Sequence, residues 1–328
     1  MSTAAVHPAR GRRITIERIE QAARAIDPVF LHSPQWVCEP LGDALGARIA
    51  LKVETINPIR SFKGRGADWL VRNLDPGASV MCASAGNFGQ AMAYACRARG
   101  VSLTVYAAET ANRLKIARMQ EMGAQVVLAG EDFDAAKARA REDSARDGVR
   151  FVEDSRDPES TEGAGTMALE WLAFPERPDA MLIPLGNGAM LAGMATVLKA
   201  RLPETRVVAV AAQGAPAMVE SLQSGRLVAH EQIDTIADGI GVRQPVPEAL
   251  DDLKGLVDEM ILVPDDRIVE AMRLLHRHAG LVAEPSGAVG LAGLLQEQER
   301  FRGETVGTVI CGGNLTPEQM RLWLQESS

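Results

Sequence analysis

The sequence predicts an α/β protein with a largely parallel sheet. Short apolar runs have the length and composition of buried strands, and amphipathic stretches typical of helices lie between most of them. Strands that alternate with helices along a chain form parallel sheets covered by helices. The 328 residues, 46% of them hydrophobic, are enough for a large core and for about two domains.

The expected strands are short apolar runs, and the expected helices are amphipathic. The strands are Ile49 to Val53, Val80 to Ala83, Leu103 to Ala107, Val126 to Ala129, Met181 to Pro184, Val207 to Ala211 and Val306 to Ile310. The helices are Ala111 to Met122, Asp134 to Arg146, Ile268 to His278 and Pro317 to Gln325. In such sheets ligands bind where loops leave the carboxyl ends of the strands.

One uncharged segment has the length of a membrane span. Ala180 to Leu198 contains no charged residue, but Pro184, Gly186, Asn187 and Gly188 interrupt it. We therefore predict a buried strand, a glycine-containing turn and a helix there, and no membrane span.

Charge and cysteine content narrow the class of protein. The net charge of -8 and the pI near 5.3 give no basic surface for nucleic acid or for an anionic membrane, so a small-molecule ligand is expected. The stretch from Met1 to Arg13 is followed by polar residues, so it lacks the apolar core of a signal peptide. Four cysteines without metal-ligand spacing suit reduced thiols in a cytoplasm: Cys38, Cys82, Cys96 and Cys311.

Three loops each follow an expected strand and open an expected helix. They are Ser84-Ala85-Gly86-Asn87, Gly186-Asn187-Gly188-Ala189 and Cys311-Gly312-Gly313-Asn314. Glycines at such junctions let backbone N–H groups approach an anion, and the start of the helix adds a favourable field. Each loop could also hold its glycines only for the turn. None of them matches a nucleotide-binding motif.

Lys63 is the side chain with the most specific setting. It lies in Ser61-Phe62-Lys63-Gly64-Arg65-Gly66, between Phe62 and glycines and just before an apolar helix. A lone lysine is normally a solvated charge, whereas partial burial here would depress its pKa and make the amine a nucleophile.

That segment resembles the cofactor-binding lysine segment of the threonine dehydratase and serine racemase family, the fold type II pyridoxal-phosphate enzymes. The resemblance continues in order over nearly the whole chain. Its other segments are Ser84 to Gln90, Pro184 to Gly193, Ile236 to Ile240, Glu284 to Ala288 and Cys311 to Asn314. It implies a tryptophan synthase β-like fold with two open parallel-sheet α/β domains, and pyridoxal 5'-phosphate as the cofactor.

The resemblance also implies a role for each matching residue. Lys63 would carry the cofactor as a Schiff base and Phe62 would pack on its ring, Asn87 would bind the ring's phenolic oxygen, and Cys311 would face the pyridine nitrogen. The cofactor phosphate would be held by Gly186, Asn187, Gly188, Ala189 and Met190. The substrate carboxylate would be held by the segment Ser84, Ala85, Gly86, Asn87 and Phe88.

A thiol at Cys311 would not keep the ring nitrogen protonated, so prompt loss of a β-hydroxyl is favoured over transamination. The expected activity is dehydration of a β-hydroxy amino acid, such as threonine, serine, an aryl-serine or hydroxyaspartate, to a 2-oxo acid and ammonia. Lys63 would remove the Cα proton. Glu284 is a candidate second acid or base, with a helix-entry carboxylate as the equal alternative.

The sequence departs from the family's pattern at four places. Asn187 and Ala189 replace two glycines of the phosphate loop, and Phe88 replaces a histidine. Ala85 stands where racemase-type members have a serine. Alanines at 211 and 217 stand where metal-dependent members have carboxylate ligands, so no metal site is expected.

The family also suggests domain boundaries and an assembly. A large cofactor-binding domain is expected from residues 1–78 plus 155–328, with a smaller inserted domain over residues 79–154, in a cytoplasmic homodimer. Two alternatives stay open. One is a β-replacement enzyme of the cysteine synthase or threonine synthase type, and the other is a non-catalytic protein that binds pyridoxal phosphate.

Overall fold

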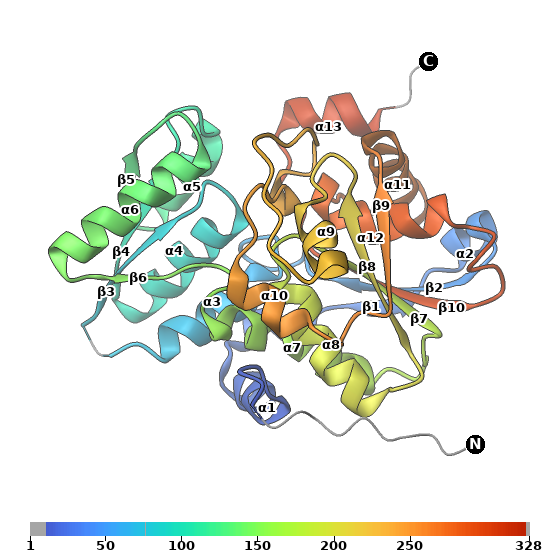
Figure 1. The fold of residues 1–328 in the computed structure, drawn as a ribbon. Helices are drawn as coiled ribbons and strands as arrows, with labels where there is room; N and C mark the ends of the chain where they lie inside the picture. Colours follow the sequence, from blue (N-terminus) through green and yellow to red (C-terminus); the bar gives the residue numbers. More distant parts are fainter. Residues whose placement is uncertain (1–10, 76, 326–328) are drawn as a thin grey trace.

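The computed structural model describes residues 11–75 and 77–325, so most of the segment Met1 to Arg13 lies outside the described residues. Two sheets dominate it, and Figure 1 shows them in two halves of the molecule that lie side by side. The six-stranded sheet has the order β1 (Gln35–Val37), β2 (Arg48–Val53), β10 (Thr305–Ile310), β7 (Ala180–Pro184), β8 (Arg206–Ala212) and β9 (Glu259–Val263). The four-stranded sheet has the order β5 (Gln125–Leu128), β4 (Ser102–Ala107), β3 (Ser79–Ala83) and β6 (Arg150–Phe151).

Both sheets are parallel, apart from the antiparallel pairing of β1 with β2. All seven expected strands are present with bounds that shift by at most one residue at either end. The prediction of an α/β protein with a largely parallel sheet is therefore confirmed.

Helices surround the sheets. In the N-terminal half of the chain they are α1 (Ile16–Ala25), η1 (Pro28–Phe30), α2 (Glu39–Leu45), α3 (Lys63–Arg72), α4 (Asn87–Arg99), α5 (Arg113–Glu121), α6 (Phe133–Asp147) and α7 (Pro158–Leu172). In the C-terminal half they are α8 (Ala189–Arg201), α9 (Ala217–Ser224), η2 (Asp238–Ile240), α10 (Pro247–Leu253), α11 (Asp265–Ala279), α12 (Pro285–Gln296) and α13 (Pro317–Leu324).

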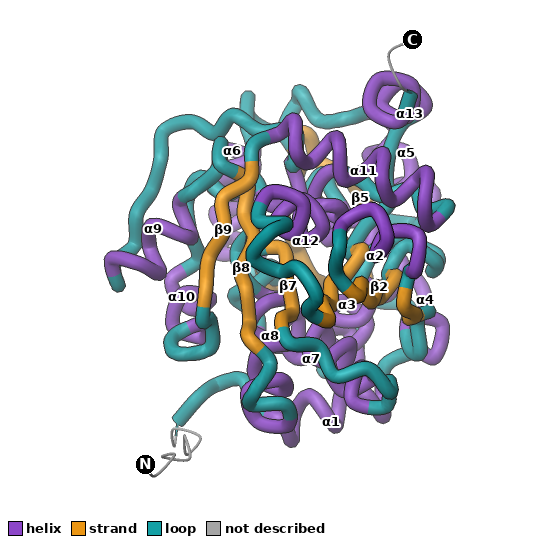
Figure 2. Tube along the Cα trace, turned by 90° about the vertical axis from the view of Figure 1, so that its right-hand side faces the viewer, coloured by secondary structure: helices purple, strands orange, loops and turns teal. Residues whose placement is uncertain are grey.

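The six-stranded sheet has a hydrophobic core on each face, because successive side chains of a strand point to opposite sides. In β8, Val208 and Val210 join the core formed with α2, α11 and α12, whereas Val207 and Ala209 join the core formed with α7 and α8. Figure 2 shows α12 beside β7 and β8, which it contacts. Strands buried on both faces explain the continuous apolar runs in the sequence.

The uncharged segment from 180 to 198 folds as expected from its interruptions. It forms the buried strand β7, a turn and the first part of α8. None of the helices in the described part of the chain is long and apolar enough to cross a membrane. All four cysteines are buried and free.

The smaller sheet and its helices come from one continuous stretch of chain. Its strands lie between Ser79 and Phe151, and the chain on both sides of this stretch contributes to the larger sheet. We propose residues 79–154 as the inserted domain, and residues 1–78 with 155–328 as the larger one.

Candidate active site

A cavity of about 520 Å³ lies between the two sheets, where loops leave the carboxyl ends of their strands. All the site residues expected from the sequence line it. They are Phe62, Lys63, Ser84, Ala85, Gly86, Asn87, Phe88, Gly186, Asn187, Gly188, Ala189, Met190, Glu284 and Cys311. Segments more than two hundred residues apart thus meet around one space.

Backbone contacts fix Lys63 next to Cys311. Phe62 donates its N–H to the carbonyl of Cys311 at 3.0 Å, and Ser61 forms a β-bridge with Gly312. Helix α3 begins at Lys63 itself, whose N–H donates to the Ser61 hydroxyl at 3.3 Å. The lysine therefore leaves the first turn of a helix whose entry is attached to the loop after β10.

A buried ion network holds α3 in place from behind. Arg65 is fully buried and contacts Glu54 at 2.8 Å and Glu170 at 2.6 Å. Lys52, also fully buried, contacts Glu170 at 2.7 Å. Removing one partner would leave an uncompensated buried charge at a cost of about 3–5 kcal/mol. This network fixes the position of the start of α3 and therefore of the Lys63 backbone.

The amine of Lys63 faces a carboxylate. Its Nζ lies 2.5 Å from Oδ2 of Asp154 and 4.6 Å from the ring centroid of Phe62, and 17% of the side chain is exposed. The expectation of partial burial beside an aromatic ring matches this geometry. The ion pair with Asp154 was not expected, because Asp154 stands 91 residues away in a segment without a recognised motif.

Glu284 lies at the centre of a hydrogen-bonded triangle. Asn87 donates its side-chain amide to Oε1 of Glu284 at 2.6 Å, and the backbone N–H of Asn314 donates to Oε2 at 3.0 Å. The Asn314 side chain donates to the oxygen of Asn87 at 2.8 Å, which closes the triangle. Both carboxyl oxygens thus accept a hydrogen bond from an asparagine.

Burial sets the protonation of Glu284. The side chain is buried, and burial, reinforced by the nearby charge of Asp238, raises the pKa of Glu284 to about 7. Lys115 opposes this shift only in part. A carboxyl group with such a pKa gains and loses a proton near neutral pH, which suits a general acid or base.

The glycine loop before α8 can hold an anion despite its two departures. Gly188 has φ of 97°, and a Cβ there would meet Leu253 at 2.7 Å, so glycine is required at this position. Asn187 and Ala189 do not have positive φ, and Ala189 is the first residue of α8. The substitutions therefore fall where side chains are tolerated.

The start of α8 offers backbone donors. Its first helical bond runs from Ala192 N to Gly188 O, so the N–H groups of Ala189, Met190 and Leu191 have no partner within the helix. Gly188 provides no side-chain cap. Such a helix start binds phosphate groups.

The loop before α4 also has donors that face the cavity. The Ser84 hydroxyl accepts hydrogen bonds from Gly86 N at 3.2 Å and Gly89 N at 3.0 Å, and this leaves its own proton to donate. The N–H groups of Asn87 and Phe88 precede the first helical bond, from Gln90 N to Gly86 O. This arrangement suits a carboxylate.

Two side chains line the cavity near the start of α12. The Cys311 thiol donates to the carbonyl of Ser286 at 3.5 Å, and burial raises the pKa of Cys311, which keeps the thiol neutral. The Ser286 hydroxyl is buried and has no hydrogen-bond partner among the residues that the structure describes. It is therefore free to bind a ligand.

Polar contacts near the cavity join one half of the molecule to the other. Lys115 pairs with Asp238 at 3.0 Å, and Arg118 donates to Asn314 at 3.1 Å. Arg243 also pairs with Asp134. These contacts join α5 and α6 to the loops of the larger sheet and hold the two halves together around the cavity.

Within the described residues, no group of three or more histidine, cysteine or acidic side chains could hold a metal ion. Alanines at 211 and 217 are buried. The nearest carboxylate in sequence, Glu220, lies 2.7 Å from His230.

The comparison with known protein families agrees with this geometry. The family model of the pyridoxal-phosphate dependent enzymes matches residues 27–312. The chain belongs to this family.

Individual relatives are similar over most of their length. The L-threonine ammonia-lyase of Thermotoga maritima is 34% identical over 305 residues, which cover 92% of this chain and 76% of that protein. Threonine deaminase isoform 2 from Solanum lycopersicum, in its processed form, is 30% identical with a TM-score of 0.86, over 94% of this chain and 92% of that one. The serine racemase of Dictyostelium discoideum is 29% identical with a TM-score of 0.84, over 92% and 99%.

The cavity fits the cofactor of the pyridoxal-phosphate dependent enzymes. It contains Lys63 at the start of α3, the free N–H groups at the start of α8, and the unpartnered Ser286 hydroxyl. Pyridoxal 5'-phosphate carries an aldehyde, a phosphate and polar ring atoms that these groups can bind. The fit rests on Lys63 and on Gly186 to Met190, which the sequence analysis named.

Three further residues contribute to the site without an expected role: Asp154 and Ser286 line the cavity, and Asn314 binds the cavity residues Asn87 and Glu284. Asn314 and Ser286 lie in the family-like segments Cys311 to Asn314 and Glu284 to Ala288, so the sequence held a signal for both. Asp154 follows the two-residue strand β6 and has no such signal.

Proposed function

We propose that this protein is a pyridoxal-phosphate-dependent lyase that removes water from a β-hydroxy amino acid and yields a 2-oxo acid and ammonia. The observation that supports this most is the placement of the Lys63 amine and a carboxyl group with a pKa of about 7, that of Glu284, around one cavity. β-Elimination needs both a base at Cα and an acid at the leaving group. The names of the relatives, L-threonine ammonia-lyase and threonine deaminase, describe this reaction class.

Each chain residue has a distinct part in this proposal. The bound cofactor would supply an electron-withdrawing ring that makes the Cα proton of an attached amino acid acidic. Lys63 takes that proton on Nζ. The Ser84 hydroxyl and the N–H groups of Asn87 and Phe88 orient the substrate carboxylate. Glu284 supplies or accepts a proton near neutral pH, and the buried thiol of Cys311 faces the ring without carrying a charge.

Threonine is the first substrate to test, because relatives at 31–35% identity are named for it. Phe88 is buried and lines the cavity, so it adds apolar surface near the substrate. Serine, an aryl-serine and hydroxyaspartate complete the panel. Release of 2-oxo acid and ammonia is measured for both enantiomers of each compound.

The same panel separates the alternatives. A protein that binds pyridoxal phosphate and turns yellow, but releases no 2-oxo acid from any member, is a non-catalytic binder. A protein that acts only when a thiol or another nucleophile is added catalyses β-replacement. We further propose a cytoplasmic homodimer, and sedimentation of the purified protein measures its mass in solution.

A further inference from the structure

Asp154 presents its carboxylate to the amine of Lys63. Its Oδ2 lies 2.5 Å from Nζ, and 28% of the Asp154 side chain is exposed. The other oxygen, Oδ1, is shielded from solvent and has no hydrogen-bond partner within the described part of the chain. Both residues line the cavity. The carboxylate is therefore partly shielded from water, and its Oδ2 forms an ion pair with the Lys63 amine.

The backbone around Asp154 is held in an uncommon conformation. Ser155 has φ of 66°, which costs a non-glycine residue of the order of 1 kcal/mol or more. Arg13 donates to the Ser155 carbonyl at 3.0 Å and to the carbonyl of Arg156, and it pairs with Asp252 at 2.6 Å. Contacts from distant parts of the chain thus maintain the turn that aims Asp154 at Lys63.

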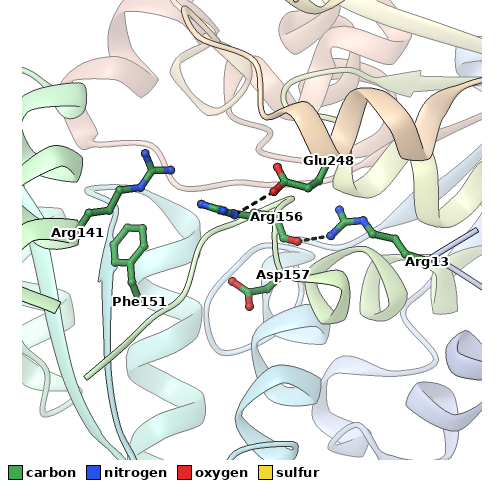
Figure 3. Close-up of a pocket in the computed structure, with 6 residues that line it drawn as sticks. All are labelled: Arg13, Arg141, Phe151, Arg156, Asp157 and Glu248. Carbon is green, nitrogen blue, oxygen red and sulfur yellow. Dashed lines mark hydrogen bonds and ion pairs between the residues drawn. The ribbon is translucent and has the colours of Figure 1, made fainter. Parts of the chain in front are cut away.

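Figure 3 shows the outer side of this turn. A shallow pocket of about 460 Å³ lies there, and in it Arg13 reaches the Arg156 carbonyl while the Arg156 side chain pairs with Glu248 at 3.2 Å. Arg141 and Asp157 complete the polar lining. The arginines of this pocket pair with carboxylates or donate to backbone carbonyls. These contacts stabilise the turn at Ser155.

The other charged groups near Asp154 have partners of their own. Glu153 pairs with Lys137 and with Arg141, and its N–H donates to Asp157 at 2.7 Å. Lys115 pairs with Asp238, which also lines the cavity. The charged or titratable side chains that line the cavity are Lys63, Lys115, Lys137, Glu153, Asp154, Asp238, Glu284 and Cys311. Among them Asp154 is the carboxylate in contact with the Lys63 amine.

We propose that Asp154 is a positioning residue for Lys63, which holds the free amine and stabilises the positive charge that develops on Nζ when it takes the Cα proton. The stabilisation of charge on Nζ rests on the proposed function. Lys63 must carry a free amine when it acts as a base, and with a free amine its Nζ lies against Asp154. The proton moves from Cα to Nζ, and the electron pair of the C–H bond becomes the bond between Cα and Cβ as the Cβ–O bond breaks.

The hydroxyl leaves as water after taking a proton from an acid in the site, so charge and atoms balance. Nζ changes from neutral to positive in this step. A fixed carboxylate interacts more strongly with the charged product than with the neutral amine, and it therefore lowers the barrier. An amide in its place would lose this difference.

The first experiment measures the lysine itself and needs no turnover. Cofactor-free protein is treated at pH 8 with a small excess of an acylating reagent, and modification of the Lys63 peptide is followed by mass spectrometry. An amine that is held in an ion pair is less available to attack the reagent, so Asp154→Asn should raise the labelling rate of Lys63 roughly threefold to tenfold. Asp251→Asn, which removes a carboxylate from an exposed pair with Lys254 on α10, is the matched control and should leave the rate unchanged.

The second experiment measures the reaction. Asp154→Asn should lower kcat by about tenfold or more and change KM by less than about threefold, and Asp154→Glu should recover part of kcat. Circular dichroism shows whether each variant is folded, and Asp154→Glu keeps the test valid if Asp154→Asn is not. An unchanged Lys63 labelling rate in a folded variant overturns the positioning role. If the native protein turns over no compound of the panel, the proposed function fails, while the labelling result still decides the contact between Asp154 and Lys63.

Discussion

Asn87 donates a 2.6 Å hydrogen bond to Glu284 across the boundary between the two sheets. Asn87 is the first residue of α4, which packs on the smaller sheet, and Glu284 precedes α12, which packs on the larger one. The backbone N–H of Asn314 fills the other oxygen of the carboxyl group. The carboxyl group is thus fixed by both halves of the molecule. The Asn87 side-chain amide and the Asn314 backbone N–H both donate to it, so neither can accept its proton.

The raised pKa of Glu284 predicts a stability that depends on pH. A carboxyl group whose pKa rises from 4.5 in the unfolded chain to about 7 in the folded protein disfavours ionisation there. Between these values the folded state binds more protons than the unfolded state, so the free energy of unfolding falls as pH rises from 4.5 to 7. The loss is at most about 3 kcal/mol and is complete above pH 7.

Glu284→Gln removes this dependence. The difference in melting temperature between variant and native protein should shift in favour of the variant by several degrees from pH 5 to pH 8. Thermal melts of cofactor-free protein at both pH values measure it. A difference that is the same at pH 5 and pH 8 would show that Glu284 has an ordinary pKa.

Lys63→Ala should abolish turnover, with a loss of more than about 10⁴-fold, because the amine is both the attachment point of the cofactor and the proposed base. The variant should still bind pyridoxal phosphate noncovalently through the start of α8. Borohydride reduction of the native protein, followed by peptide mapping, should place the cofactor on the peptide that contains Lys63. Attachment to a different lysine would contradict the assignment.

The strands that the sequence predicted correctly are the buried ones. Runs such as Val207 to Ala211 are apolar at every position because helices cover both faces of the sheet. The strands that were missed lie at sheet edges, where burial is incomplete or the strand is short: β1, β6 and β9. Helix α5 begins at Arg113 and not at Ala111, because the Asn112 side chain caps it.

The cavity residues were predictable where they belong to glycine-containing motifs. Lys63, Gly188 and Cys311 have such contexts, and all three line the cavity. Asp154 was not predictable, because its significance lies in one contact with a residue 91 positions away that depends on the turn at Ser155. Tertiary contacts of this kind leave no local pattern in a single sequence.

The loop before α8 should tolerate change at one position and not at its neighbour. Gly188→Ala places a side chain at φ of 97° and a Cβ 2.7 Å from Leu253, at a cost of about 1–3 kcal/mol. We expect the dissociation constant for pyridoxal phosphate to rise about tenfold or more. Ala189→Gly is the matched control and should change it by less than about threefold. Titration of cofactor-free protein by absorbance measures both values, and equal affinities would mean that the loop does not bind the phosphate.

Cys311→Ser should keep activity within about threefold of the native protein, because thiol and hydroxyl are both neutral partners for a ring nitrogen. Cys311→Asp should lower kcat for elimination at least tenfold, since a carboxylate would keep that nitrogen protonated and prolong the carbanion at Cα. Steady-state kinetics with the best substrate of the panel measure both variants. An aspartate variant as active as the native protein would refute this account of the electron sink.

The last prediction concerns Ala85 and the alanines at 211 and 217. Return of a proton to the opposite side of Cα requires an acid on the face away from Lys63, and the methyl group of Ala85, which lines the cavity, cannot supply one. A divalent cation such as magnesium or calcium requires several oxygen ligands, usually with carboxylates among them. The alanines at 211 and 217 are buried and offer none, while Glu220 is engaged with His230 at 2.7 Å.

Activity should therefore survive exhaustive chelation, and unreacted substrate should keep its handedness, as measured by chiral chromatography after partial turnover. Formation of the opposite enantiomer would show a second acid that replaces the missing serine. A loss of activity that magnesium restores would show that carboxylates elsewhere in the chain form a metal site in place of the alanines at 211 and 217.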